Sequence, residues 1–191
     1  MIGPEVQLPE VQLVERCLAG DSSGARSFVE MFQGTIFGLC YRMVGHRQDA
    51  EDLTQEVFTR AFRSLSGWDR IRPLKPWLLM IAANCCRTAL SKRARLPECN
   101  EFADDVAARP EIVRDTEFAE AVQRALATLR EDHRACFILF YEQELSVNEV
   151  AETLGCPEGT IKTWLHRARK DVAELLKRQG FGADVPDSNR D

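Results

Sequence analysis

Residues 146–177 read SVNEVAETLGCPEGTIKTWLHRARKDVAELLK and predict two helices joined by a tight turn. Ser146 is a good N-cap residue, and Glu149 follows it at the spacing of a capping box. Gly155 can adopt the left-handed conformation that closes a helix. Pro157 suits the first turn of the next helix, where its missing N–H would have no partner. The local signals therefore place a helix–turn–helix here.

The second of these helices divides into two faces at about 3.6 residues per turn. Its apolar face carries Ile161, Leu165, Ala168, Val172, Leu175 and Leu176. Its polar face carries Lys162, Thr163, His166, Arg167 and Lys170, with Arg169 at the edge. A DNA-binding helix–turn–helix lays such a polar face in the major groove, where Lys and Arg contact phosphates or guanine. The alternative interpretation is a helical hairpin whose charged face is only solvated.

The composition of the whole chain favours a helical protein with packed cores. The 191 residues are 45% hydrophobic and 29% charged, which suits one or two small domains. No run of about eighteen apolar residues occurs, so we expect no membrane insertion. The N-terminus lacks the basic and apolar segments of a secretory signal, so we expect a cytoplasmic protein.

Charge is segregated along the chain, although the net charge is −5. Acidic residues cluster at Asp49, Glu51, Asp52 and Glu56, and again in 98–120. Basic residues cluster in 87–95 and 162–170. An acidic average with basic patches fits a protein that meets both a basic partner and DNA.

The seven cysteines do not form a recognisable metal or redox motif. No Cys-x-x-Cys occurs and no His lies at zinc-finger spacing, so no metal site and no cofactor is predicted. Cys40, Cys85 and Cys136 fall on apolar helix faces, where a free thiol behaves as a small hydrophobic group. Redox sensing remains an alternative.

Hydrophobic periodicity predicts further helices before the helix–turn–helix. They cover 6–19, 25–44, 48–65, 77–95, 116–129 and 132–141. Residues 96–115 have little periodicity, two prolines and many acids, and predict a flexible linker. Residues 179–191 predict a disordered tail.

Two surfaces of the first helices could bind a partner or could simply face solvent. The acidic side of 48–65 is either a solvated surface with favourable charge near a helix N-terminus or a docking face for a positively charged partner. The basic loop 66–76 and the basic helix after it fit capture of single-stranded DNA, where bases stack and phosphates are neutralised. Trp77 is predicted to be a core residue, whereas Trp68 could lie in the core or stack on a base.

Two parts of the chain resemble conserved regions of the sigma-70 family. Residues 49–62 (DAEDLTQEVFTRAF) and 76–93 (PWLLMIAANCCRTALSKR) resemble region two, and residues 129–172 resemble region four. With only a short linker between them, this layout resembles the extracytoplasmic-function group, over about residues 10–177. The resemblance implies an all-α fold of two small helical domains joined by a flexible linker: region 2 over 8–95, the linker over 96–115 and region 4 over 116–178.

The resemblance also implies a function and its residues. The chain would direct bacterial core RNA polymerase to promoter DNA, in a stress response, without being an enzyme. Asp52, Gln55 and Glu56 match the family's D-L-x-Q-E motif, and with Asp49 they would bind core polymerase. The −10 element would be bound by Trp68, Arg70, Arg72, Lys75, Asn84, Arg87 and Ser91. The −35 element would be bound by Lys162, Thr163, His166, Arg167, Arg169 and Lys170. Family members are usually held by an anti-sigma factor, so such a partner is expected.

The sequence departs from the family pattern at two positions. Glu144 stands where a Gly usually precedes Leu-Ser, and Trp164 stands where a basic residue is common. Trp164 lies at the flank of the predicted recognition helix, where it could pack or contact a phosphate.

Three other classes of function remain as alternatives. An autonomous helix–turn–helix regulator would bind duplex DNA tightly without polymerase. A redox-responsive or metal-responsive protein would use the cysteines. An enzyme is the least favoured, because no His, nucleophile or metal ligand accompanies the paired acids.

Overall fold

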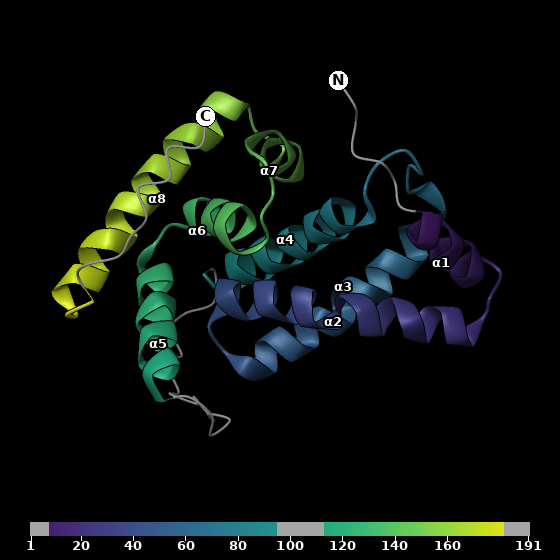
Figure 1. The fold of residues 1–191 in the computed structure, drawn as a ribbon, viewed down its shortest axis with the longest axis horizontal. Helices are drawn as coiled ribbons and strands as arrows, with labels where there is room; N and C mark the ends of the chain where they lie inside the picture. Colours follow the sequence, from purple (N-terminus) through teal and green to yellow (C-terminus); the bar gives the residue numbers. More distant parts are fainter. Residues whose placement is uncertain (1–7, 95–112, 182–191) are drawn as a thin grey trace.

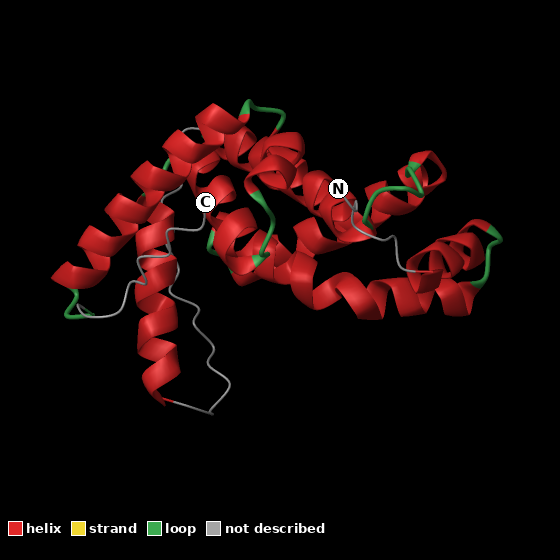
Figure 2. Cartoon of the chain, turned by 45° about the horizontal axis from the view of Figure 1, so that its top comes forward, coloured by secondary structure: helices red, strands yellow, loops and turns green. Residues whose placement is uncertain are grey.

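The computed structural model describes residues 8–94 and 113–181, and every regular element within them is a helix (Figures 1 and 2). The predicted all-α fold class is therefore confirmed. None of the helices in these two ranges combines the length and the apolar character needed to cross a bilayer.

The first module, residues 8–94, is a bundle around the long helix α2. Its elements are α1 (Leu8–Leu18), α2 (Ser22–Val44), α3 (Arg47–Ser64), the 3₁₀ turn η1 (Leu65–Gly67) and α4 (Leu74–Arg93). Apolar side chains of α2 such as Phe28, Ile36 and Met43 are fully buried against α1, α3 and α4. Met31 of the same helix is 55% exposed.

Local signals fix the ends of α2. Asp21 is its N-cap and accepts a hydrogen bond from the N–H of Ser23 at 2.8 Å. Gly45 closes the helix in the left-handed conformation with φ of 76°.

Helix α4 begins at Leu74, within the loop predicted for 66–76. Pro73 is the N-cap residue, and Pro76 lies in the first turn, where a proline costs no hydrogen bond. The Leu74 N–H donates to the Glu10 carboxylate of α1 at 3.2 Å. A side chain distant in sequence thus caps α4, which explains why local signals put its start too late.

The second module, residues 113–181, is a smaller helical array. It comprises α5 (Val113–Thr128), α6 (Glu131–Phe137), the π-helical turn η2 (Ile138–Glu142), α7 (Val147–Leu154) and α8 (Glu158–Arg178). Helix α5 begins inside the stretch predicted as a linker, so residues 113–115 correct that prediction. The rest of the predicted linker, 96–112, lies outside the described residues.

The start of the predicted disordered tail is packed. The ring of Phe181 lies 5.6 Å from that of Phe118 on α5, in an edge-to-face arrangement. Phe181 therefore corrects the prediction at the first positions of the tail. Residues 182–191 lie outside the described residues.

The predicted helix–turn–helix is confirmed at residue level. Both halves of the capping box are present: the Ser146 N–H donates to Glu149 at 2.8 Å, and the Glu149 N–H donates to the Ser146 hydroxyl. Gly155 ends α7 with φ of 66°. Pro157 is the N-cap of α8, one position before the expected first turn.

Helix α4 lies between the two modules, with α2 and α3 on one side and α6 and α7 on the other (Figure 1). Leu78, Ala82 and Cys85 of α4 are buried, and so are Leu79, Ala83 and Cys86. Cys86 lies against Cys40 of α2, whereas α6 and α7 of the second module cover another part of α4.

Candidate binding surfaces

An acidic row runs along the outer side of α3. Asp52, Gln55 and Glu56 are exposed, while Val57, Phe58 and Ala61 hold the opposite side of the helix in the core. The spacing of three and four residues places the exposed carboxylates on one face. Such a face suits a positively charged partner.

The members of this row have different neighbours. The Glu56 carboxylate lies 2.6 Å from Arg60 one turn later, and this hydrogen bond raises the pKa of Arg60. Asp49 is half-buried and lies 3.4 Å from Arg93 of α4. Asp49 is thus tied to its own module more closely than Asp52 or Gln55.

The loop before α4 carries a buried tryptophan, Trp68, followed by basic side chains. Trp68 is only 6% exposed, and its indole N–H has no hydrogen-bond partner in the described part of the chain. A ring in this position is not available to stack on a base, so the structure favours the core interpretation of Trp68. Arg70 is exposed and pairs with Glu15 of α1 at 3.0 Å.

The apex of this loop exposes Ile71, which sequence reasoning did not single out. Its N–H donates to the Asp69 carboxylate at 3.0 Å, which forms a tight turn, and its side chain is 81% exposed. The signal in the sequence was a large apolar residue between two arginines.

The polar side of α4 divides between solvent and the second module. Asn84 and Ser91 are exposed. Lys75 and Arg87 instead contact the second module, and so does Arg72 from the loop. The structure therefore brings three of the predicted −10 residues together at the junction of the modules.

The polar face of α8 is open along its length. Lys162, Thr163, His166, Arg167 and Lys170 are exposed, and Arg169 at the edge is half-buried. The apolar face is buried at Ile161, Leu165, Ala168, Val172 and Leu176, as predicted, whereas Leu175 is half-buried. The structure thus presents all six predicted −35 residues from one helix.

Trp164 packs rather than projecting outward. Its ring lies 5.9 Å from the ring of His133 on α6, and both side chains join the core of the second module. Burial, with the nearby charges of Arg130 and Arg167, lowers the pKa of His133. The contact between this imidazole and the indole gives Trp164 a packing role.

The cysteines of the described residues are free thiols. Cys40, Cys85 and Cys136 are buried, which confirms their prediction as core residues, and burial raises the pKa of Cys136 to about 12. The Cys40 and Cys86 sulfurs lie 3.7 Å apart, and the hydrogen bond between them, with burial, raises the pKa of Cys86. Cys99 lies outside the described residues.

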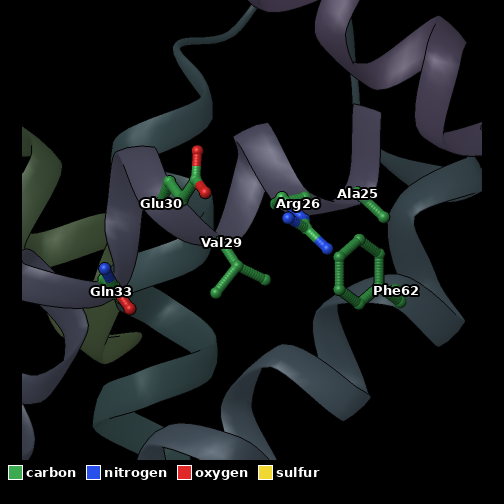
Figure 3. A pocket seen from close by; sticks show the side chains of 6 residues that line it. All are labelled: Ala25, Arg26, Val29, Glu30, Gln33 and Phe62. Carbon is green, nitrogen blue, oxygen red and sulfur yellow. The ribbon is translucent and has the colours of Figure 1, made fainter. Parts of the chain in front are cut away.

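In the described ranges, no group of three His, Cys, Asp or Glu side chains could hold a metal ion. An open depression of about 530 Å³ lies between α2 and α3 (Figure 3). It is lined by Ala25, Arg26, Val29, Glu30, Gln33 and Phe62. These side chains offer a mixed surface with no pairing of a nucleophile and a base.

Comparisons with known proteins match both modules. The model of Sigma-70 region 2 matches residues 28–96, and that of Sigma-70, region 4 matches residues 119–172. RNA polymerase sigma-H factor of Pseudomonas aeruginosa is 31% identical over 185 residues, covering 90% of this chain and 95% of the relative. The ECF RNA polymerase sigma-E factor of Escherichia coli K12 is 30% identical over 179 residues, covering 87% and 93%. ECF sigma factor SigW of Bacillus subtilis is 28% identical, covering 86% and 95%.

Two solved structures have the same helical arrangement. One is the sigma factor RpoE from Bartonella quintana in complex with the anti-sigma factor NepR, with a TM-score of 0.69 and 27% identity, covering 80% of this chain and 96% of that chain. The other is CnrH in complex with the cytosolic domain of CnrY, with a TM-score of 0.65 and 22% identity, covering 87% and 96%. The second likeness concerns the fold alone.

Proposed function

Because this chain belongs to the extracytoplasmic-function group of the sigma-70 family of RNA polymerase sigma factors, we propose a division of labour among its surfaces. Members of this family are not enzymes, so the function depends on which surfaces contact the polymerase and which contact the promoter. The acidic row of α3 binds core polymerase, the loop and the outer side of α4 bind the −10 element, and α8 binds the −35 element. Membership of this family argues against the alternative of an autonomous helix–turn–helix regulator that binds duplex DNA without polymerase.

The observation that carries this proposal is the pair of oppositely charged helix faces on two modules. Asp52 and Glu56 expose carboxylates on α3, and Arg167 and Lys170 expose cations on α8. A negative face cannot approach DNA phosphates favourably, whereas a positive face can. The first module therefore supplies the protein contact, and the second supplies the duplex contact.

The −10 contacts are assigned to the basic and amide side chains around the start of α4. They are Arg70, Arg72, Lys75, Asn84, Arg87 and Ser91. Cations neutralise the phosphates of the melted strand, and Asn84 offers both a donor and an acceptor to a base edge. Trp68 is left out because its ring is in the core.

The −35 contacts are assigned to the open face of α8. Arg167 can donate two hydrogen bonds to the O6 and N7 of guanine, and Lys162 and Lys170 can neutralise phosphates. Thr163, His166 and Arg169 complete the face. Trp164 contributes by packing against His133, which holds the recognition helix on α6.

An anti-sigma factor is the proposed regulatory partner, and the cytoplasm is the proposed site of action. The sigma factor RpoE from Bartonella quintana was solved in complex with the anti-sigma factor NepR, and RpoE has the same helical arrangement as this chain. A protein that restrained either charged face would block promoter use.

The test is co-elution of the full chain with purified bacterial core polymerase on size-exclusion chromatography. Wild-type protein should elute with core as a stoichiometric complex. Elution of the chain only at its free position, with core shown to be active by another sigma factor, would overturn the proposal.

A further inference from the structure

Two thiols from distant parts of the sequence meet in the core of the first module. Cys40 lies on α2 and Cys86 on α4, 46 positions apart in the chain. Their sulfurs are 3.7 Å apart, and both residues are 0% exposed. Figure 1 shows α2 and α4 side by side, and the two helices pack directly on each other. The fold, and not the spacing in the sequence, makes these two sulfurs neighbours.

The geometry of the pair suits a covalent bond. The Cys86 thiol donates a hydrogen bond to the Cys40 sulfur, so the two side chains already point toward each other. A disulfide has a sulfur–sulfur distance of about 2.0 Å, so the sulfurs have to approach by about 1.7 Å. Shared between two side chains, this is less than about 1 Å each, which rotation about the Cα–Cβ bonds supplies. Bond formation thus asks for side-chain movement between helices that are already in contact.

The hydrogen bond also gives the two thiols different reactivities. By donating to Cys40, the Cys86 thiol lowers the pKa of Cys40, against the opposing effect of burial. The same hydrogen bond, together with burial, raises the pKa of Cys86. A thiolate, and not a thiol, is the nucleophile that attacks an oxidant. Cys40 is therefore suited to react first, and Cys86 lies in place to react with the product.

Other thiols of the described chain are directed elsewhere. The sulfurs of Cys136 and Cys156 each donate to a backbone carbonyl oxygen within the second module. Cys85, the neighbour of Cys86 in the sequence, is also buried, and burial raises its pKa. The contact between two sulfurs, and not burial alone, therefore distinguishes Cys40 and Cys86.

We propose that Cys40 and Cys86 form a reversible disulfide when the protein meets hydrogen peroxide. The Cys40 thiolate attacks one peroxide oxygen, the O–O bond breaks, and Cys40 becomes a sulfenic acid while the released hydroxide takes up a proton. The Cys86 sulfur then attacks the sulfenic sulfur, the S–O bond breaks, and hydroxide leaves as water with the Cys86 proton. Overall, the two thiols lose two electrons and two protons, and hydrogen peroxide becomes two molecules of water.

Burial determines how fast this oxidation occurs and where it stops. Since both residues are 0% exposed, peroxide reaches them when the helices open locally, so the reaction is slower than that of an exposed thiol. Once the sulfenic acid has formed, the Cys86 sulfur is already beside it, whereas a second peroxide molecule must enter from solvent. The pair should therefore stop at the disulfide, which thiols reduce, and not continue to the sulfinic acid.

The bond would close a long loop of the first module. The segment between Cys40 and Cys86 contains all of α3, including the acidic residues Asp52 and Glu56. A cross-link over such a loop removes freedom from the unfolded chain and so stabilises the folded one. The oxidised protein should therefore unfold at a higher temperature than the reduced protein.

The test compares wild type with Cys86→Ala and Cys85→Ala in the full chain. The variants remove one buried thiol each from adjacent positions of α4, but only Cys86→Ala removes the partner of Cys40. Each protein is treated at low concentration with a small excess of hydrogen peroxide, and the remaining thiols are alkylated. Tryptic peptides are then analysed by mass spectrometry with and without dithiothreitol. Cys40 lies in peptide 27–42, and Cys85 and Cys86 share peptide 71–87, so the variants and the fragment ions identify the bonded neighbour.

Wild type and Cys85→Ala should give peptides 27–42 and 71–87 linked together, and dithiothreitol should separate them. Both proteins should gain about 5 °C or more in Tm on oxidation. Cys86→Ala should show neither the linked peptides nor the gain in Tm.

Three results would overturn the proposal. The first is an absence of linked peptides from wild type after the half-buried Cys17 and Cys156 have been oxidised. The second is a link that persists in Cys86→Ala or is lost from Cys85→Ala, because either would assign the bond to Cys85. The third is an oxidised wild type whose Tm is no higher than that of the reduced protein. The peptide masses and fragment ions of wild type test the bond even if a variant folds poorly.

Discussion

The guanidinium of Arg87 on α4 lies 3.2 Å from the carboxylate of Asp132 on α6, and about a third of each side chain remains exposed. The two residues belong to different sigma regions, so their ion pair joins the proposed −10 surface to the module that holds the recognition helix. A proposed −10 residue is thereby paired with a carboxylate of the second module.

The first prediction concerns the acidic row of α3. Replacing Asp52 and Glu56 with Ala should weaken binding to core polymerase by about tenfold or more, mainly through slower association, because charge complementarity steers encounter. Titration of labelled protein with core measures this. Glu117→Ala with Glu174→Ala is the control and should bind as wild type does. Undiminished binding of the α3 variant would contradict the assignment.

The second prediction concerns the recognition helix. Arg167→Ala should cost about 1–3 kcal/mol on duplex that carries the −35 element if Arg167 makes a bidentate base contact. Competition between specific and scrambled duplex measures it. Arg178→Ala, at the exposed end of the same helix, should have a smaller effect. An equal loss on scrambled DNA would mark Arg167 as a phosphate contact instead.

The third prediction concerns Glu144, the non-glycine residue with positive φ in the described part of the chain, at 60°. The left-handed conformation strains an L side chain by about 1–2 kcal/mol, and Gly avoids that strain. Glu144→Gly should therefore raise Tm by about 2–4 °C for a stabilisation near 1 kcal/mol. Glu144→Ala keeps the strain and should show no such gain. A lower Tm for the Gly variant would contradict this account.

The fourth prediction is a pH dependence from His133. Its folded-state pKa lies below the ordinary value of 6.5, chiefly because it is buried. As pH falls below about 6.5, the unfolded chain binds a proton that the folded chain does not, so stability present above that pH is lost. Urea unfolding at several pH values measures the loss. His133→Gln should show a shallower decline, and a decline identical to that of wild type would contradict the role of His133.

The helix–turn–helix was predictable because its signals are local. Ser146 and Glu149 cap α7 and Gly155 ends it, all within a few residues of their own positions. The apolar residues of α8 recur at helical spacing, and this spacing predicts which face is buried. The acidic row of α3 could be found in the same way. The contribution of distant elements could not be predicted in this way. Glu10 of α1 caps α4, and α6 and α7, which lie far along the chain, cover part of α4.

The same reason explains the site residues that sequence reasoning missed or misjudged. Asp132 and Glu152 look like ordinary surface acids, and their pairing with Arg87 and Arg72 depends on the meeting of the two modules. Trp68 sits among basic residues as a stacking residue would, yet its ring fills the core beside η1. Charge and spacing suggest what a side chain can do, whereas packing decides whether it is accessible.

The most direct measurement of the central claim is in vitro transcription with purified bacterial core polymerase and this chain over a library of promoter templates. The account predicts initiation from a subset of templates that share two spaced elements, strongly reduced by Asp52→Ala with Glu56→Ala and lost from that subset with Arg167→Ala. Initiation that is absent from every template, or that is unchanged by both variants, would contradict it.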